Sequence, residues 1–424
     1  MQKIRSKGVH IKDIDKKPIA DSSVLFAVHN SLPYDKSGYA IRTHSIVSHL
    51  HENNLSIVVA TRAGYPWDLH KHKQSPQNHK TDMISGIQYV RLEDAKKTFK
   101  QGSDYKYIIT YAKELIRIAK QSNSTIIHGH SNYLNGLASI KAANTLGLPS
   151  IYEIRGLWHI TRLTLDHHYK EGGMFEYEQQ MEKAAALHAD AVVTISQSLK
   201  TLITSWGVDE TKIHVIPNAV NTTLFQPTRK DEKLLEKYNL KDKTIIGFIG
   251  SLTGYEGLEQ LVLAVNSLLK ENINIALIIV GDGRNKTHLE SLTFSPNVIF
   301  TGRVPFEEVK AYYTLFDICP FPRNDFEVCH YVPPLKILEA MAMQKAIIVS
   351  DVPPLLEIIE DHTNGLICKA NDVDSLKASI LTLLYDDNLK SKLAQNAYSW
   401  VNKNRTWDLM IHKYIALYNS FKAK

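Results

Sequence analysis

Short apolar runs alternate with amphipathic segments along most of the chain. The run SVLFAVH at 23–29 has no regular polar position, which is typical of a strand buried on both faces of a parallel sheet. The segment 108–121 instead repeats its apolar residues at helical spacing. Further strands are expected at 57–61, 87–92, 125–130, 150–155, 191–195, 213–216, 245–249, 276–280, 298–301, 318–320 and 347–350. Further helices are expected at about 40–51, 174–188 and 407–421.

This alternation predicts the fold class and the domain organisation. Strand, helix and parallel strand in succession are typical of a doubly wound α/β domain. The chain has 424 residues, which is enough for two such domains with separate cores. The segment PNAVN at 217–221 interrupts the alternation with a proline and indicates a hinge. We therefore expect a polar N-terminal extension at 1–20, domains at 21–220 and 221–403, and a closing helix at 404–424.

The stretch PPLKILEAMA at 333–342 carries the most informative chemistry. Because apolar runs flank it, we expect a helix that begins at the carboxyl edge of the sheet, with the proline pair in its first turn. The free N–H groups and the dipole of such a helix start favour an anion such as a diphosphate. Lys336 would add positive charge, and Glu339 could accept hydrogen bonds from a sugar diol. Each residue also has a simpler explanation. Lys336 can be an ordinary solvated lysine, and Glu339 can be present because the helix dipole favours a negative charge near the start of a helix.

Two other strand ends carry candidate ligands. Gly38 lies between the first strand and the first helix, where a glycine loop can bring N–H groups close to a phosphate or can serve a turn alone. His128 and His130 share one face at the end of the strand 125–130. Such a pair could bind a metal, but no Asp, Glu or Cys at matching spacing completes a site. We expect no metal, and a structural role stays open for both histidines.

The stretch 333–342 belongs to a longer series of motifs. In chain order these are SQSL at 196–199, IPNAVN at 216–221, GSLTGYEGLEQL at 250–261, IIVGDG at 278–283, TGRV at 301–304, PLKILEAMA at 334–342 and NGLI at 364–367. The series resembles the retaining glycosyltransferases of family four, also called group 1, and is close to an exopolysaccharide (exosortase-associated) subgroup. The resemblance implies the GT-B fold, in which two Rossmann-like doubly wound parallel-sheet domains face each other across a cleft. It also implies that the C-terminal helix crosses back to the first domain.

The resemblance further implies a donor, a UDP- or GDP-sugar, and the residues that bind it. The residues expected to act in catalysis, by position and charge, are His130, His330, Lys336 and Glu339. Glu339 would bind the ribose, and Arg303 with Val304 would flank the base. The full set expected to bind the donor is Gly38, Arg42, Arg155, Gly250, Ser251, Arg303, Val304, Pro334, Leu335, Lys336 and Glu339. No metal and no other cofactor is expected.

Two places depart from the family pattern. Most of the family has an Arg and a Lys that hold the diphosphate where this chain has Ser251 and Glu256. The replacement charges are expected to come from Lys336, Arg303 and Arg155. The family also has a glutamate that contacts the donor sugar, eight residues before the position of Glu339 or, in the subgroup, nine. Those positions are Tyr331 and His330 here.

Composition narrows the partners and the location. The net charge of +6 comes without a dense basic block interleaved with aromatics, so nucleic acid is not an expected partner. Peripheral contact with the anionic inner face of a plasma membrane stays open. No apolar run reaches the ~20 residues of a membrane-spanning helix, and the polar N-terminus does not resemble a signal peptide. Three cysteines without metal or redox spacing suit a reducing compartment, so we predict a cytoplasmic protein.

The leading hypothesis is a retaining glycosyltransferase with a glycan or lipid-linked glycan acceptor. Its setting would be the synthesis of a surface polysaccharide such as capsule or lipopolysaccharide. Two alternatives stay open. A nucleotide-sugar epimerase or hydrolase of the same fold would need no acceptor. A catalytically silent GT-B subunit that only binds nucleotide is motivated by Ser251, Glu256 and the missing glutamate.

Overall fold

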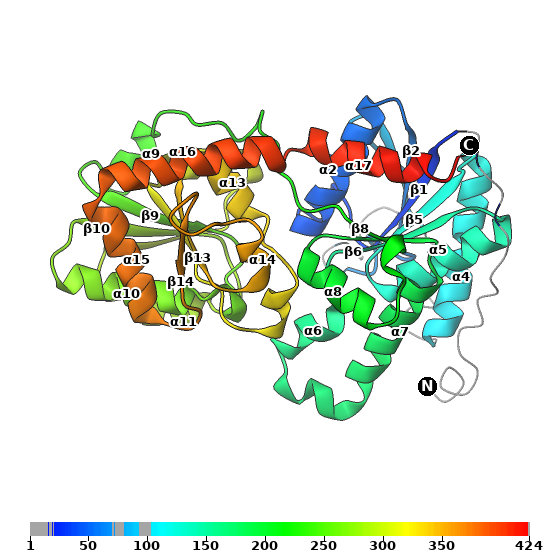
Figure 1. Cartoon of the computed structure of the whole chain (residues 1–424), viewed down its shortest axis with the longest axis horizontal. Helices are drawn as coiled ribbons and strands as arrows, with labels where there is room; N and C mark the ends of the chain where they lie inside the picture. The colour runs from blue at the N-terminus through cyan, green and yellow to red at the C-terminus, as the bar shows by residue number, and fades with distance from the viewer. Residues whose placement is uncertain are drawn as a thin grey trace. The chain divides into compact units, whose positions relative to one another are not determined.

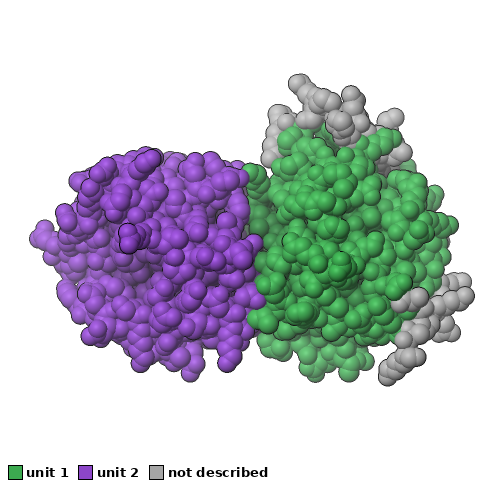
Figure 2. Space-filling model, turned by 90° about the horizontal axis from the view of Figure 1, so that it is seen from above, with its two compact units in different colours: residues 1–217, 407–424 green, residues 218–406 purple. Residues whose placement is uncertain are grey.

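The computed structural model describes residues 16, 19, 21–69, 72, 80–92 and 103–422 (Figure 1). The chain forms two compact units (Figure 2). Unit 1 comprises 1–217 with 407–424, and unit 2 comprises 218–406. The chain leaves unit 1 after Pro217, inside the segment PNAVN, and returns to it at Trp407. Apart from positions 16 and 19, the expected extension at 1–20 lies outside the described residues.

Unit 1 contains an eight-stranded sheet with the strand order β3-β4-β2-β1-β5-β6-β7-β8. All neighbouring strands are parallel except β3 and β4. The strands are β1 (Ser23–Val28), β2 (Ser56–Thr61), β3 (Thr81–Ile84), β4 (Ile87–Val90), β5 (Ile126–His130), β6 (Ser150–Ile154), β7 (Ala191–Thr194) and β8 (Ile213–Val215). The central strands β1, β5 and β6 are buried along almost their whole length, which explains their apolar runs.

The sequence analysis missed β3. This strand pairs antiparallel with β4 through a turn at Ser85 and Gly86, which both have positive φ (52° and 77°). None of its residues is fully buried. Because β3 lies at the edge of the sheet, its residues need no apolar run, and the pattern on which strand prediction depends is absent.

The helices of unit 1 are α2 (Gly38–Glu52), α4 (Asp104–Gln121), α5 (Tyr133–Leu146), α6 (Trp158–Leu163), α7 (Met174–His188), α8 (Gln197–Ser205) and α17 (Trp407–Asn419). Gly136 allows α5 to approach the sheet closely, since a Cβ there would lie 2.5 Å from the Tyr152 ring. Ser196 caps α8 by accepting a hydrogen bond from the Leu199 N–H at 3.1 Å. Within unit 1, α17 packs against α2 (Figure 1).

Unit 2 contains a six-stranded parallel sheet with the order β11-β10-β9-β12-β13-β14. The strands are β9 (Thr244–Ile249), β10 (Ile275–Val280), β11 (Val298–Gly302), β12 (Ile318–Phe321), β13 (Ala346–Ser350) and β14 (Leu366–Cys368). The helices are α9 (Glu232–Lys237), α10 (Leu258–Lys270), α11 (Lys286–Ser291), α12 (Val309–Leu315), α13 (Lys336–Ala342), α14 (Pro353–Leu356), α15 (Val373–Tyr385) and α16 (Asp387–Asn404). The prediction missed β14, whose three residues are too few to form a pattern.

The prolines before α13 were placed wrongly by the sequence analysis. The helix begins at Lys336, so Pro333 and Pro334 precede its first turn and belong to the loop after β12. Pro333 is buried, and its carbonyl accepts a hydrogen bond from Nδ2 of Asn218 at 3.2 Å. The loop is therefore fixed at this point by a residue of the PNAVN segment. Across the described part of the chain, no helix has the length and apolar character needed to cross a bilayer.

Candidate functional site

The predicted site residues divide between the two units. Unit 1 contains Gly38, Arg42, His130 and Arg155. Unit 2 contains Gly250, Ser251, Arg303, Val304, His330, Pro334, Leu335, Lys336 and Glu339. Gly38 is exposed at the first residue of α2, whereas the other three residues in unit 1 are buried together.

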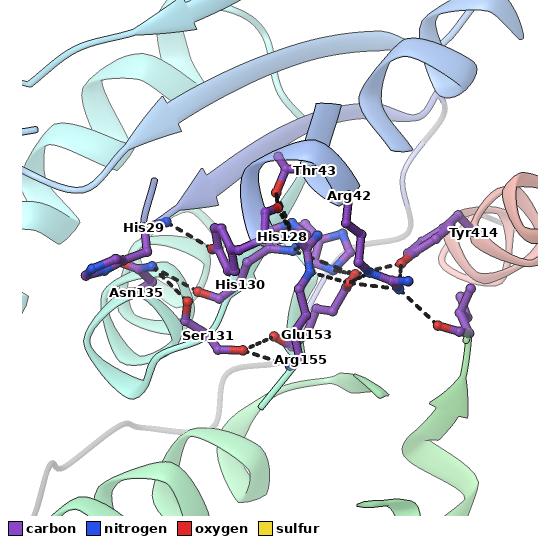
Figure 3. A network of polar contacts seen from close by, with 12 residues as sticks. His29, Arg42, Thr43, His128, His130, Ser131, Asn135, Glu153, Arg155 and Tyr414 are labelled. Atoms are coloured by element: carbon purple, nitrogen blue, oxygen red, sulfur yellow. Dashed lines mark hydrogen bonds and ion pairs between the residues drawn. The ribbon is translucent and has the colours of Figure 1, made fainter. Parts of the chain in front are cut away.

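Glu153 is the centre of a buried polar network in unit 1 (Figure 3). Its Oε1 accepts hydrogen bonds from Nε of Arg155 at 2.7 Å and from Nε and Nη2 of Arg42 at 3.3 Å. Its Oε2 accepts a hydrogen bond from the Tyr414 hydroxyl of α17 at 2.8 Å. These four residues, with His128 and His130, form the strand-end network, which lies where β5 and β6 end.

The guanidinium groups of the strand-end network keep Glu153 ionised, and burial keeps both histidines neutral. Burial alone would raise the pKa of Glu153, but the guanidinium groups of Arg155 and Arg42 outweigh burial and hold that pKa well below its usual range. Burial lowers the pKa of His128. Burial and the neighbouring Arg155 lower the pKa of His130 well below its usual value. The network therefore holds one negative and two positive charges around neutral imidazole rings.

The tautomer of His130 follows from its neighbour. Nη2 of Arg155 lies 2.8 Å from Nδ1 of His130, and a guanidinium group can only donate, so Nδ1 accepts and Nε2 carries the proton. Nε2 is buried and has no hydrogen-bond partner in the described part of the chain. The Nε2–H of His130 is therefore a buried donor for which the described residues provide no acceptor. His128 contacts protein groups instead, with Nδ1 3.0 Å from the Tyr418 hydroxyl and Nε2 3.4 Å from Oε2 of Glu153.

The structure supplies a third potential metal ligand that the sequence spacing did not reveal. His128, His130 and Glu153 offer ligand atoms within 4.8 Å of one another. These residues do not fit a cation, because Glu153 already binds two guanidinium groups and His130 Nδ1 binds one of them. A metal would meet two fixed positive charges at this place. The expectation of a metal-free reaction stays a prediction.

Arg42 and Arg155 use their hydrogen bonds inside unit 1. Arg42 also donates to the carbonyls of Ile216 and Pro217, at 3.0 and 3.1 Å. Arg155 also donates to Oγ1 of Thr43 at 2.6 Å. Their side chains are only 3% and 5% exposed. This geometry favours an internal role for both arginines in place of the expected direct contact with donor phosphates.

In unit 2, Lys336 and Glu339 form an ion pair across the first turn of α13. Nζ of Lys336 lies 3.1 and 3.0 Å from the two carboxylate oxygens of Glu339. The Tyr313 hydroxyl, on α12, donates to Oε2 of Glu339 at 3.1 Å. Burial and the nearby Glu339 raise the pKa of Tyr313, so its hydroxyl stays protonated. The sequence analysis missed Tyr313, because an aromatic residue in an amphipathic helix gives no signal beyond core packing.

Gly250 lies where the ends of β9 and β10 pack backbone against backbone. Gly281 has a φ of 143°, and a Cβ on it would lie 1.8 Å from the Gly250 carbonyl oxygen. A Cβ on Gly283 would lie 2.3 Å from the Leu252 carbonyl oxygen. Ser251 is exposed beside this crossing. The arrangement presents main chain rather than side chains at the carboxyl end of β9. The N–H groups of Gly250 and Leu252 are used within the protein, since they donate to the carbonyls of Val280 and Asp282 at 3.0 and 3.1 Å.

The other predicted residues of unit 2 lie in loops at the carboxyl ends of strands. Arg303 is exposed and Val304 half-buried, directly after β11. Pro334 and Leu335 are half-buried before α13. His330 ends a short 3-10 turn, and its Nε2 contacts Oδ1 of Asp325. Asp325, which the sequence analysis did not single out, places a carboxylate next to the position where the family glutamate is missing.

Comparisons with known proteins identify the family. Residues 37–224 match the family model Glycosyltransferase Family 4. Residues 230–400 match the family model Glycosyl transferases group 1. Together the two matches span most of the chain, which belongs to the group 1 glycosyltransferase family.

Relatives with curated names are distant. An uncharacterized glycosyltransferase of Methanocaldococcus jannaschii is 28% identical over 59% of this chain and 63% of the relative. The match thus spans less than two thirds of that relative. CapM of Staphylococcus aureus, a capsular polysaccharide biosynthesis glycosyltransferase, is 25% identical over 64% of this chain and 70% of CapM.

Solved structures show the fold. Sucrose-phosphate synthase from Thermosynechococcus elongatus aligns with a TM-score of 0.76 at 17% identity, over 94% of this chain and 98% of that chain. Anabaena HepE in complex with UDP aligns with a TM-score of 0.72 at 14% identity, over 94% of this chain and 100% of that chain. These similarities define the fold as GT-B, built from two parallel-sheet α/β domains.

Proposed function

We propose that this chain is a retaining glycosyltransferase that moves a sugar from a UDP- or GDP-sugar to a glycan or lipid-linked glycan acceptor. The observation that carries the proposal is the contact of Lys336 and Tyr313 with Glu339, inside the region that matches the group 1 model. HepE has been solved with UDP and with UDP-glucose, which supports a UDP-sugar as the first donor to test.

Lys336 and Glu339 would change partners when the donor binds. The ammonium group of Lys336 would leave Glu339 for a donor phosphate, which is a charge-assisted contact. The two freed carboxylate oxygens of Glu339 would then accept hydrogen bonds from the ribose hydroxyls, while Tyr313 keeps the carboxylate in place. The main-chain N–H of Ser251 would bind the diphosphate next to Gly250, whose own N–H donates to the Val280 carbonyl. The residues at 303–304 would flank the base.

In the proposed step, the bond between sugar C1 and the diphosphate oxygen breaks, and the acceptor hydroxyl oxygen bonds to C1 on the same face. The departing diphosphate takes the hydroxyl proton, so no protein nucleophile is required. The protein would supply charge and position. Lys336 would stabilise the charge that develops on the diphosphate. His130, through its Nε2–H, and His330 would orient the sugar through its hydroxyl groups.

The proposed setting is surface polysaccharide synthesis on the cytoplasmic face of a membrane. The relative CapM carries a name from capsular polysaccharide biosynthesis, which supports this setting. A net charge of +6 would favour peripheral contact with an anionic bilayer, where a lipid-linked acceptor is held.

Donor binding is best tested by thermal shift with UDP, GDP, ADP and CMP and then with their sugar conjugates. A ligand at about 100 times its Kd stabilises the folded state by about 2.7 kcal/mol, so one nucleotide should raise the Tm clearly. Lys336→Ala and Glu339→Ala should each weaken binding of that nucleotide by roughly tenfold, because each removes a hydrogen bond to a charged group. The matched control is Lys390→Ala, since Lys390 pairs with Asp387 in the same i,i+3 arrangement.

The outcomes separate the proposal from its alternatives. A product that keeps the anomeric configuration of the donor, read by NMR, supports the retaining reaction. Wild-type transfer rates in both alanine variants would exclude this site. Free sugar or an epimer without acceptor would favour a hydrolase or epimerase. Nucleotide binding without turnover across the donor panel would favour a silent subunit, which the side chains at positions 251 and 256 motivate.

A further inference from the structure

Glu256, which stands where most of the family has a lysine, forms a buried ion pair with Arg323. Nη2 and Nε of Arg323 lie 2.7 and 3.2 Å from the two carboxylate oxygens of Glu256. The two side chains are 6% and 11% exposed. A two-point contact of this kind fixes the orientation of the guanidinium plane as well as its distance. The altered position is therefore paired within the protein.

The pair joins two loops that follow neighbouring strands. Glu256 ends the 3-10 turn Gly254–Glu256 after β9, and Arg323 lies in the loop after β12. The N–H and Nδ2 of Asn324 donate to the carbonyls of Tyr255 and Gly254, at 3.1 and 2.8 Å. The guanidinium carbon of Arg323 lies 5.3 Å from the centre of the Tyr255 ring. These contacts are called the loop contact below.

Gly257 allows the loop contact to form. Its φ is +69°, and a Cβ on it would lie 1.7 Å from the Pro322 carbonyl oxygen. No side chain could occupy that space without separating the two loops. The geometry of the turn and the ion pair therefore depend on each other.

Arg323 also holds the segment that leads to α13. Its Nη1 donates to the Val332 carbonyl at 2.6 Å, and Val332 lies between His330 and the start of the helix. The next carbonyl, that of Pro333, is held by Asn218. Both contacts fix the main chain within a few residues of His330 and Lys336. The guanidinium group is thereby engaged on three of its nitrogens, so it serves the protein rather than a ligand.

We propose that Glu256 and Arg323 are positioning residues, which hold His330 and the segment before α13 at the distance that sugar transfer requires. This inference rests on the proposed function. The pair acts through Val332, because Nη1 of Arg323 donates to the Val332 carbonyl while Nε and Nη2 of the same guanidinium group are fixed by Glu256. Arg323 thus does more than neutralise Glu256, and a lysine could not replace it. A lysine would keep the charge but could not contact both carboxylate oxygens and the Val332 carbonyl in one plane.

The test compares Arg323→Lys, Arg323→Gln and Glu256→Gln with Lys230→Gln. Lys230 is the matched control, since it pairs with Asp317 elsewhere in unit 2. For each protein the kcat, the donor KM and the Kd for the nucleotide alone are measured. The kcat is counted per nucleotide-binding site, so that partial unfolding does not lower it. We expect all three variants to lose at least tenfold in kcat, while the Kd for the nucleotide alone changes by less than about threefold. The control should keep the kcat and the nucleotide Kd of the unsubstituted chain.

Arg323→Lys gives the sharpest outcome, because it separates position from charge. Wild-type kcat in this variant would overturn the proposal and would indicate that positive charge alone suffices. Equal losses in nucleotide affinity and in kcat would also overturn it, because they would indicate direct donor binding. If the unsubstituted chain binds no nucleotide and transfers no sugar from any donor, the proposed function fails and this inference fails with it. An active parent chain with fully active variants would overturn the inference alone.

Discussion

Both units bury arginine–carboxylate contacts near the carboxyl ends of their central strands, but the two clusters are built differently. In unit 1, Arg42 and Arg155 share the single carboxylate of Glu153. In unit 2, Arg323 and Glu256 pair one to one. Burial alone would lower the pKa of Arg323, but Glu256 outweighs burial and raises it. The first cluster joins elements of the core, whereas the second joins two loops.

The same kind of ion pair thus stabilises a whole unit in one place and the position of one loop in the other. Glu153 is reached by α2, by the end of β6 and by α17, so it connects segments far apart in the sequence. The pair in unit 2 reaches a single carbonyl in the segment before α13. Loss of the first cluster should therefore affect the folding of a whole unit. Loss of the second should affect the geometry of one loop.

The largest expected effect is that of Glu153→Gln. The substitution leaves two buried guanidinium groups without a counter-charge, so unit 1 should lose about 3–5 kcal/mol of unfolding free energy. Urea denaturation followed by circular dichroism measures the loss. Glu114→Gln is the control, because Glu114 pairs with Arg117 on the exposed face of α4 and should change stability by less than about 0.5 kcal/mol. A similar small change for Glu153→Gln would contradict the comparison.

Gly257→Ala should destabilise unit 2 by about 3 kcal/mol, because it combines an unfavourable φ with a clash against the Pro322 carbonyl. Gly147→Ala isolates the cost of the positive φ, so the difference between the two variants gives the cost of the clash. Gly147 has the same φ of +69° but no atom within 4 Å of the added Cβ, so its variant should lose only about 1 kcal/mol. Thermal unfolding of both variants gives the difference. Equal losses would show that the loop contact can yield to a methyl group.

Glu182 is a third case, a buried carboxyl that has no arginine partner among the residues that the structure describes. Burial raises its pKa from 4.5 to about 7, and its oxygens accept hydrogen bonds from the Tyr152 hydroxyl and the Tyr133 N–H. Since the folded protein keeps a proton that the unfolded chain releases, stability should fall as pH rises from about 4.5 to 7. Glu182→Gln should remove about 2 kcal/mol of that pH dependence.

The measurement is the unfolding free energy of wild type and Glu182→Gln between pH 5 and 8. The difference in unfolding free energy between the two proteins should change with pH only up to about pH 7, where Glu182 still binds its proton in the folded state. Glu153 should behave in the opposite way, because its pKa is lowered and its stabilisation is lost as pH falls. A constant difference between wild type and Glu182→Gln would disprove the raised pKa.

The sequence predicted most of the fold because buried parallel strands leave continuous apolar runs. The run at 23–29 became β1, and helix 174–188 was placed at its observed bounds. β3 could not be predicted, since an edge strand needs no such run. The start of α13 was misplaced because a proline pair suits both a first turn and the loop before it.

The site was predictable only where residues stand close together in the sequence. Lys336 and Glu339 are one turn apart, so their contact follows from helical spacing. The pair of Glu256 and Arg323 is separated by 67 positions, and it exists because β9 and β12 are neighbours in the sheet. Arg42 was expected to reach a phosphate, since nothing in the sequence shows that Glu153 lies beside it.

The return of the chain to unit 1 at Trp407 has a consequence for biosynthesis. During translation, the first 217 residues leave the ribosome long before α17, which supplies Tyr414 to Glu153 and Tyr418 to His128. Until α17 has been made, the strand-end network lacks Tyr414. Meanwhile the whole of unit 2 is made and can fold. Unit 1 therefore completes its buried network after unit 2 has been made, although its synthesis begins first.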